Sequence, residues 1–106
     1  MRGAREILVY ALSDPRDERV RYVAFVVSTT RDYRLEQHAD GAIEATRAWS
    51  DELRAAGLRP TFVLLETVRA PDRQAFARAG RIMSGHIDRM RAKGEPLLQY
   101  TKRVSR

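Results

Sequence analysis

The stretch VYALSDPRDERVRYVAFVV, residues 9–27, decides how this chain folds. It holds two apolar runs, rich in β-branched and aromatic residues, on either side of the polar segment SDPRDE at residues 13–18. In that segment a proline fixes one backbone dihedral angle, and two aspartates are able to hydrogen-bond to their own backbone. The pattern predicts an antiparallel β-hairpin in which residues 6–12 and 19–27 pair as neighbouring strands.

The two predicted strands differ in how their apolar residues are arranged. The first run, EILVYAL, is apolar almost throughout, which is typical of a strand covered on both faces. On the second strand, alternation places four side chains on one face: Val20, Tyr22, Ala24 and Val26. Each strand carries one tyrosine, so Tyr10 and Tyr22 are expected to approach each other across the hairpin.

Helical spacing and a third apolar run follow the hairpin. Helices are predicted over about residues 31–39 and 42–56, each ended by a glycine, and a long helix is predicted over about residues 70–93. A proline precedes a third strand at residues 61–68. The order strand, strand, helix, helix, strand, helix predicts an α+β fold, in which helices flank a three-stranded antiparallel sheet.

Apolar residues at helical spacing indicate which faces of these helices are buried. The expected stripe of the second helix is Ala42, Ala45, Trp49, Leu53 and Ala56. The expected stripe of the long helix is Phe76, Ala79, Met83, Ile87 and Met90. After this helix, the segment GEPLLQY is expected to pack back onto the fold. A length of 106 residues indicates one domain, assigned to residues 1–100, with a basic tail at residues 101–106.

Composition limits the chemistry open to the chain. It has no cysteine, which excludes disulfides, thiolate zinc sites and cysteine nucleophiles, and suits a reducing cytoplasm. No apolar run is long enough to span a bilayer, and the first run is interpreted as a strand rather than a signal peptide, so we expect a cytoplasmic protein. The net charge of +6, carried mostly by arginine, favours a polyanionic partner but is also compatible with an ordinary basic surface.

Four residues form the candidate catalytic site: Tyr10, Tyr22, Arg34 and His38. The arginine and the histidine are four residues apart on a predicted helix and therefore share a face. Hydroxyls, a guanidinium and an imidazole together can hold a phosphate, orient a water and offset charge on a phosphoryl group. A structural interpretation stays open, because tyrosine is common in sheets and the other two residues could lie on a solvated helix face.

In this order, these residues resemble the GIY-YIG nuclease superfamily. Its two tyrosine triplets and its Arg-x-x-x-His motif are matched by LVY, RYVA and RLEQH, and its later segments by WSDELRAAGLRPTFVLLETV and RAKGEPLLQY. The similarity spans nearly the whole chain. It implies a three-stranded antiparallel sheet flanked by helices, one divalent metal held by a late glutamate, and phosphodiester cleavage assisted by the tyrosines and the arginine.

The sequence departs from the superfamily at positions that matter for cleavage. Ala24 stands where the second triplet has glycine, and Gln99 stands where asparagine is usual. The late helix has no glutamate; the metal position falls near Met83, whose thioether does not suit a hard cation, so this residue is assigned to the core. No cofactor is therefore expected, although an active enzyme would need Mg²⁺ or Mn²⁺, with Asp88 or a dimer partner as the source of a ligand.

Three hypotheses follow. The favoured one is a degenerate, catalytically impaired GIY-YIG-like domain that binds nucleic acid, DNA rather than RNA, through Arg31, Arg34 and Arg47. The second is an active metal-dependent endonuclease that cleaves DNA. The third is a structural subunit whose apolar strand edge, FVV at residues 25–27, pairs with a second copy or another protein.

The remaining polar residues receive structural interpretations. Glu66 and Asp72 are expected to be isolated surface acids, and His86 is expected to have no acidic partner. Three arginines at positions 16, 19 and 21 are interpreted as a soluble rim of the hairpin, with nucleic-acid contact as the alternative.

Overall fold

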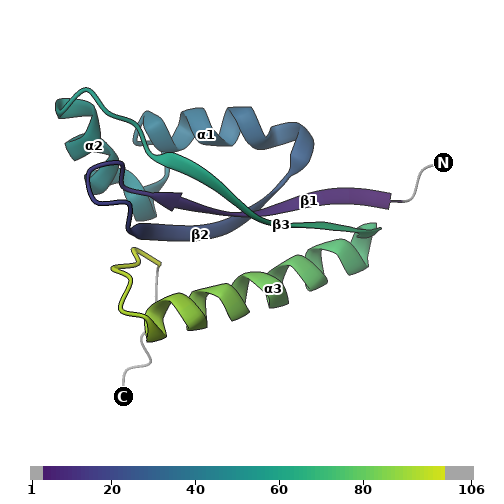
Figure 1. The fold of residues 1–106 in the computed structure, drawn as a ribbon. Coiled ribbons are helices and arrows are strands. Elements are labelled where there is room, and N and C mark those ends of the chain that lie inside the picture. Colours follow the sequence, from purple (N-terminus) through teal and green to yellow (C-terminus); the bar gives the residue numbers. More distant parts are fainter. Residues whose placement is uncertain (1–3, 100–106) are drawn as a thin grey trace, which may run out of the picture.

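A computed structural model describes residues 4–99 and shows a three-stranded antiparallel sheet with helices on both faces (Figure 1). The elements in chain order are β1 (Ala4–Ser13), β2 (Val20–Val27), the 3-10 turn η1 (Ser28–Thr30), α1 (Arg31–Ala39), the 3-10 turn η2 (Glu44–Thr46), α2 (Arg47–Ala55), β3 (Thr61–Pro71) and α3 (Asp72–Ala92). The strand order is β2-β1-β3. The α+β fold class expected from the sequence is therefore confirmed.

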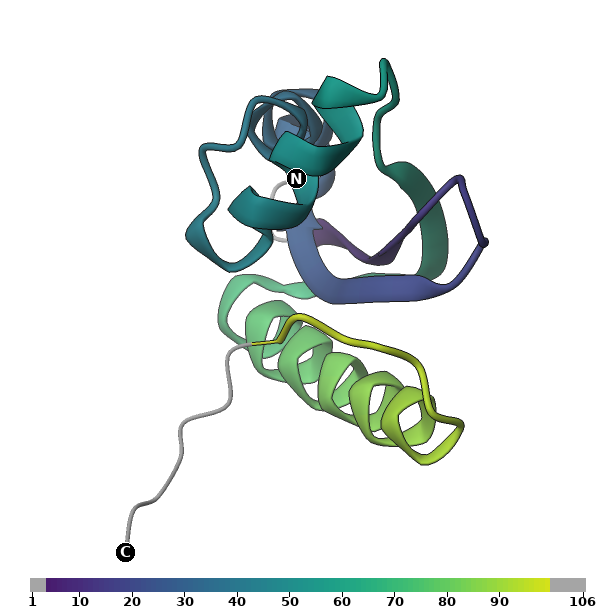
Figure 2. The same cartoon turned by 90° about the vertical axis from the view of Figure 1, so that its left-hand side faces the viewer.

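The central strand β1 is buried on both faces, as its uninterrupted apolar sequence predicts. Its side chains alternate between two cores. Leu8, Tyr10 and Leu12 belong to the core that also contains Trp49 and Leu53 of α2. The side chains between them, Ile7 and Val9, point to the opposite face and belong to the core against α3. Figures 1 and 2 show α1 and α2 on one side of the sheet and α3 on the other.

The hairpin turn forms as the sequence predicts. The Asp14 carboxylate accepts a hydrogen bond from the backbone N–H of Arg16 at 2.8 Å, and Asp17 accepts one from that of Arg19 at 2.9 Å. These local bonds satisfy backbone groups that the turn leaves without a strand partner. Glu18 adopts a positive φ of 61° and completes the turn.

The second helix begins later than expected. Regular α-helix starts at Arg47 rather than at residue 42, and only the short turn η2 precedes it. Gly41 adopts a φ of 80° and Ile43 is extended, so the chain needs these residues to turn between α1 and α2. Ala42 is consequently exposed instead of lying on a buried stripe, and so is Ala56.

The third strand is longer than expected, and the last helix is shorter. Ala70 and Pro71 were expected to open the helix, but they pair with the start of β1 and belong to β3. Pairing along the full length of β1 outweighs the local signal of a proline at a helix start. The register of β3 shifts by one residue opposite Val9 and Tyr10, which makes Leu65 a β-bulge residue.

The face of α3 that meets the sheet also differs from the expected stripe. Ala75 and Ala79 are fully buried, with Ile82 and Met83 packed beside them, so the small alanines set the line of close approach. Phe76 is displaced to the flank of the helix and is 42% exposed. The assignment of Met83 to the core is confirmed. Among the helices of residues 4–99, none has both the length and the apolar character to cross a bilayer.

The segment after α3 packs back along the outer edge of β2, as expected (Figure 2). Leu98 donates its backbone N–H to the Arg21 carbonyl at 2.6 Å. The Gln99 side-chain amide accepts from the Val23 N–H at 2.7 Å and donates to the Val23 carbonyl at 2.9 Å. These contacts cover the first half of β2, while the FVV segment forms its far end. The predicted tail at residues 101–106 lies outside the described residues.

Candidate functional site

The four predicted site residues come together on the sheet face that α1 and α2 cover. The Tyr10 hydroxyl lies 3.1 Å from Nε2 of His38, and the ring of Tyr22 packs edge-on against the His38 ring at a centroid distance of 5.4 Å. The positive charge of Arg34 acts on both tyrosine hydroxyls, where it opposes the rise in their pKa values. The four side chains therefore lie close together in the structure, as the sequence predicted.

Register and helix geometry explain this convergence. Tyr10 pairs with Ala24 and Leu12 pairs with Tyr22, so the two tyrosines are diagonal neighbours on one face rather than a direct pair. Arg34 and His38 lie one helical turn apart on α1, which runs over this face (Figure 1).

Buried hydrogen bonds fix the histidine and the first tyrosine. His38 Nδ1 lies 3.0 Å from the Thr46 hydroxyl, which in turn donates to the Ile43 carbonyl at 3.5 Å. This order is satisfied when Nδ1 carries the histidine proton and Tyr10 donates its hydroxyl proton to Nε2. Burial, together with the charge of Arg34, lowers the pKa of His38 to about 4, so the imidazole is neutral at pH 7. Burial raises the pKa of Tyr10 to about 12.

Accessibility divides these four residues into two pairs. Tyr10 is 0% exposed and His38 is 1% exposed, and the ring of Phe62 stacks on Tyr10 at a centroid distance of 5.3 Å. Tyr22 and Arg34 are only partly buried. A ligand can therefore contact Tyr22 and Arg34, whereas Tyr10 and His38 are buried beneath them and inaccessible to it.

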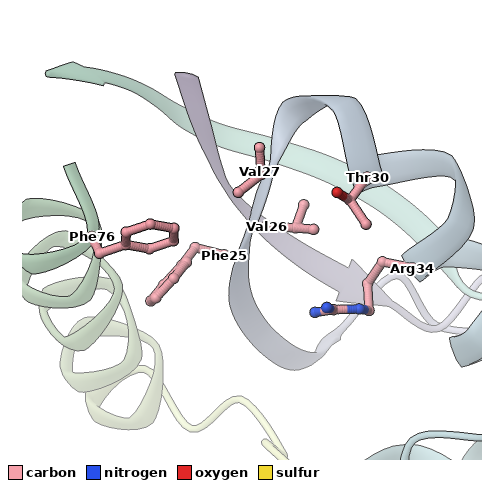
Figure 3. Close-up of a pocket in the computed structure, with 6 residues that line it drawn as sticks. All are labelled: Phe25, Val26, Val27, Thr30, Arg34 and Phe76. Carbon is pink, nitrogen blue, oxygen red and sulfur yellow. The ribbon is translucent and has the colours of Figure 1, made fainter. Parts of the chain in front are cut away.

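An open groove adjoins Arg34 at the far end of β2 (Figure 3). Its volume is about 230 Å³, and its lining residues are Phe25, Val26, Val27, Thr30, Arg34 and Phe76. Figure 3 shows the two phenylalanines on one side, the arginine on the other and the valines between them. The sequence did not single out Thr30 or Phe76 for this site; the latter was assigned to the core because helical spacing alone does not fix the rotation of α3.

Arg34 differs in its partners from the arginines of the hairpin, which pair with carboxylates. Its Nε donates to the Gln37 side-chain oxygen at 3.1 Å, and within residues 4–99 no carboxylate forms an ion pair with it. A half-buried guanidinium that faces a groove without a carboxylate partner is suited to bind an external anion.

The other two arginines predicted to bind nucleic acid do not line this groove. Arg31 lies over the Phe62 ring, 5.6 Å from its centroid, and pairs with Asp32. Arg47 donates its Nε to the Gly41 carbonyl at 2.8 Å and so stabilises the connection between α1 and α2. The three residues are therefore not one cluster.

The arginines of the hairpin are held by acidic groups. Asp14 is fully buried and accepts hydrogen bonds from Arg16, Arg21 and the indole of Trp49. The Arg16 guanidinium, assisted by Trp49, holds the pKa of Asp14 well below its usual range. Arg19 lies 3.6 Å from the carboxylate of Glu95. These contacts support the interpretation of this group as a structural rim of the hairpin.

One expectation about the acids was wrong. Glu66 and His86 were each expected to lack a partner, but the glutamate carboxylate lies 3.3 Å from His86 Nε2. Glu66 lies on β3 and His86 on α3, and these elements pack together in the fold, which the separate sequence segments could not indicate. Within residues 4–99, no set of three or more histidine, aspartate or glutamate side chains is placed to hold a metal ion.

Three comparisons with known proteins complete the description of this site. No protein-family model, no curated protein and no solved structure matches the chain.

Proposed function

We propose that this chain is a nucleic-acid-binding module, built on a degenerate GIY-YIG-like scaffold, that grips a backbone phosphate of DNA at Arg34. The resemblance of the sequence to that nuclease superfamily supports the class of ligand. The net charge of +6 favours a polyanion and supports the same choice.

The observation that carries the proposal is the environment of Arg34. Its guanidinium is half-buried at an open groove and, among residues 4–99, has no carboxylate partner. The hydroxyl of Tyr22, whose pKa burial raises, remains protonated and can donate a second hydrogen bond to a phosphate oxygen. An arginine fork with a neighbouring hydroxyl matches the geometry of a phosphate group.

Burial of the other two site residues favours binding over cleavage. A group that activates or orients a water must lie within hydrogen-bond reach of it. Tyr10 and His38 are enclosed by α1, by Phe62 and by each other, so they hold Tyr22 in place rather than meet a substrate.

The test is the affinity for a fluorescein-labelled DNA oligonucleotide, measured by anisotropy at several salt concentrations. Replacement Arg34→Ala is expected to weaken binding roughly tenfold, because one charge-assisted phosphate contact is lost. The slope of log K against log salt should fall in magnitude by about 0.7 to 0.9, the value for one phosphate contact. Arg34→Lys keeps the positive charge but lacks the forked guanidinium, so its affinity for DNA should lie between that of the wild type and that of Arg34→Ala.

Arg81→Ala is the matched control, since Arg81 is exposed on α3 and does not line the groove. It removes the same charge and should change affinity far less than Arg34→Ala. A salt slope near zero for the wild-type chain, or equal losses in both variants, would contradict the assignment of the phosphate site.

A further inference from the structure

We propose that the groove beside Arg34 accepts a single unpaired nucleotide, with its base packed against Phe25 and Phe76 and its phosphate at the guanidinium. This inference rests on the proposed function and specifies the form of nucleic acid that the chain selects: single strands or extruded bases rather than intact duplex.

Two aromatic rings supply the surface for the base. Phe76 of α3 is 42% exposed. Its ring centroid lies 6.2 Å from that of the partly buried Phe25 on β2, and the rings are tilted by 50°. Exposed aromatic rings beside basic residues are the usual means by which proteins hold single-stranded nucleic acid.

Charge around the rings matches a nucleotide. Arg34 stands across the groove from the phenylalanines (Figure 3). The guanidinium of Arg5 lies over the ring of Phe76, 6.0 Å from its centroid, and adds positive charge near the rings. A base packed against the two phenylalanines would meet an apolar surface, while its phosphate would meet the positive charge of Arg34.

The size of the groove restricts the ligand further. At about 230 Å³ it is smaller than the cavities of roughly 300–1,000 Å³ that typically enclose whole cofactors. A single base with its adjoining phosphate needs only an open groove of this kind. In an intact duplex the bases are stacked and paired, so their faces could reach the phenylalanines only after extrusion.

An acidic peptide is the competing occupant, since the outer edge of β2 ends in this groove. A peptide strand would need backbone partners along β2, but Leu98 and Gln99 already occupy the first half of that edge. The pair of phenylalanines opposite the Arg34 guanidinium is better matched by a base and a phosphate.

The experiment compares three labelled ligands, each at several salt concentrations: a twelve-nucleotide thymidine strand, a strand of equal length made of abasic nucleotides, and a duplex. The wild-type chain should bind the thymidine strand about five- to a hundredfold more tightly than the abasic strand, which has the same phosphates. Phe76→Ala should lose that preference while keeping its affinity for the abasic strand and its salt slope.

Leu64→Ala is the matched control, because Leu64 is 51% exposed on β3 and does not line the groove. It should bind all three ligands as the wild type does. A urea unfolding curve for Phe76→Ala, near that of the wild type, verifies that the variant is folded. Should it be unfolded, Phe76→Leu replaces it and is expected to lose most of the preference, because leucine offers no ring face.

The outcomes separate this inference from the proposed function. Equal binding of thymidine and abasic strands, or tighter binding of duplex, overturns the unpaired-nucleotide site but leaves phosphate binding intact. A wild-type salt slope near zero overturns both. Binding of a glutamate-rich peptide that depends on Phe76, with no binding of the thymidine strand, would assign the groove to a protein partner and overturn both as well.

Discussion

His38 is a buried histidine whose surroundings favour the neutral imidazole. Its Nε2 lies 3.1 Å from the Tyr10 hydroxyl and its Nδ1 lies 3.0 Å from the Thr46 hydroxyl, so one ring nitrogen can accept while the other donates. Protonation would place a second positive charge near Arg34 and would remove the acceptor at Nε2. Burial, followed by the positive charge of Arg34, lowers the pKa of His38 from the ordinary 6.5 to about 4.

This pKa predicts how stability depends on pH. The folded state binds the proton less readily than the unfolded chain, so the contribution of His38 is complete above pH 6.5 and is lost as the pH falls towards 4. The free energy of unfolding should decrease by roughly 3 kcal/mol over that interval, from about 1.4 kcal/mol per pKa unit. Urea unfolding at half-unit steps from pH 7 to pH 4.5 measures it.

His38→Gln provides the control, since glutamine does not titrate. Its curve should be flatter between pH 6.5 and pH 4.5, whatever its absolute stability. The carboxyls with lowered pKa values, Glu6, Asp14 and Asp17, lose their contributions below about pH 4.5 and do not obscure the comparison. An identical pH dependence in variant and wild type would show that His38 is not the titrating group.

Asp14 illustrates which part of a residue's role the sequence can show. Its position before a proline in a polar turn predicted the backbone hydrogen bond that it accepts from Arg16. Its complete burial and its bond of 2.9 Å to the indole of Trp49 depend on a helix 35 residues further along the chain. No local pattern contains that information.

At the scale of elements, β2 is an edge strand that the chain itself partly covers. Gln99 pairs its side-chain amide with both backbone groups of Val23, much as a residue of a fourth strand would. This contact protects half of an exposed edge from pairing with other chains. It also holds the segment after α3 against the first half of β2, away from the groove.

Gln99→Ala should release that cover. The Val23 amide then loses its acceptor, and we expect its hydrogen exchange to become about fivefold faster or more, from the usual worth of one hydrogen bond. Amide exchange followed by NMR measures this directly. Gln74→Ala, an exposed glutamine on α3, should leave Val23 unchanged. If Val23 exchanges equally in wild type and Gln99→Ala, the contact does not protect this edge.

Elements with a strong period were predicted well, and their junctions were not. The hairpin and α1 follow from alternation and helical spacing. The late start of α2 and the extension of β3 to Pro71 arise from backbone geometry at Gly41 and from pairing with β1. Such choices are made by tertiary contacts, which outweigh local propensity.

At the scale of the whole molecule, Arg34 is set apart by its place at the groove. Arginines at the hairpin, on α2 and on β3 pair with carboxylates, whereas Arg34 faces the groove. The sequence correctly grouped Arg34 with both tyrosines and His38. It could not show that two of the four are sealed, or that Phe76 turns outward to complete the groove, because both follow from how α1 and α3 dock on the sheet.

The most direct test of the central claim is an NMR titration that follows the arginine Nε–Hε signals as a single-stranded DNA oligonucleotide is added. If Arg34 grips a phosphate, its Nε–Hε signal should shift progressively, together with the ring signals of Phe76. The signal of Arg81 should shift far less. An unchanged Arg34 signal at saturating DNA, with shifts confined to other arginines, would contradict the account.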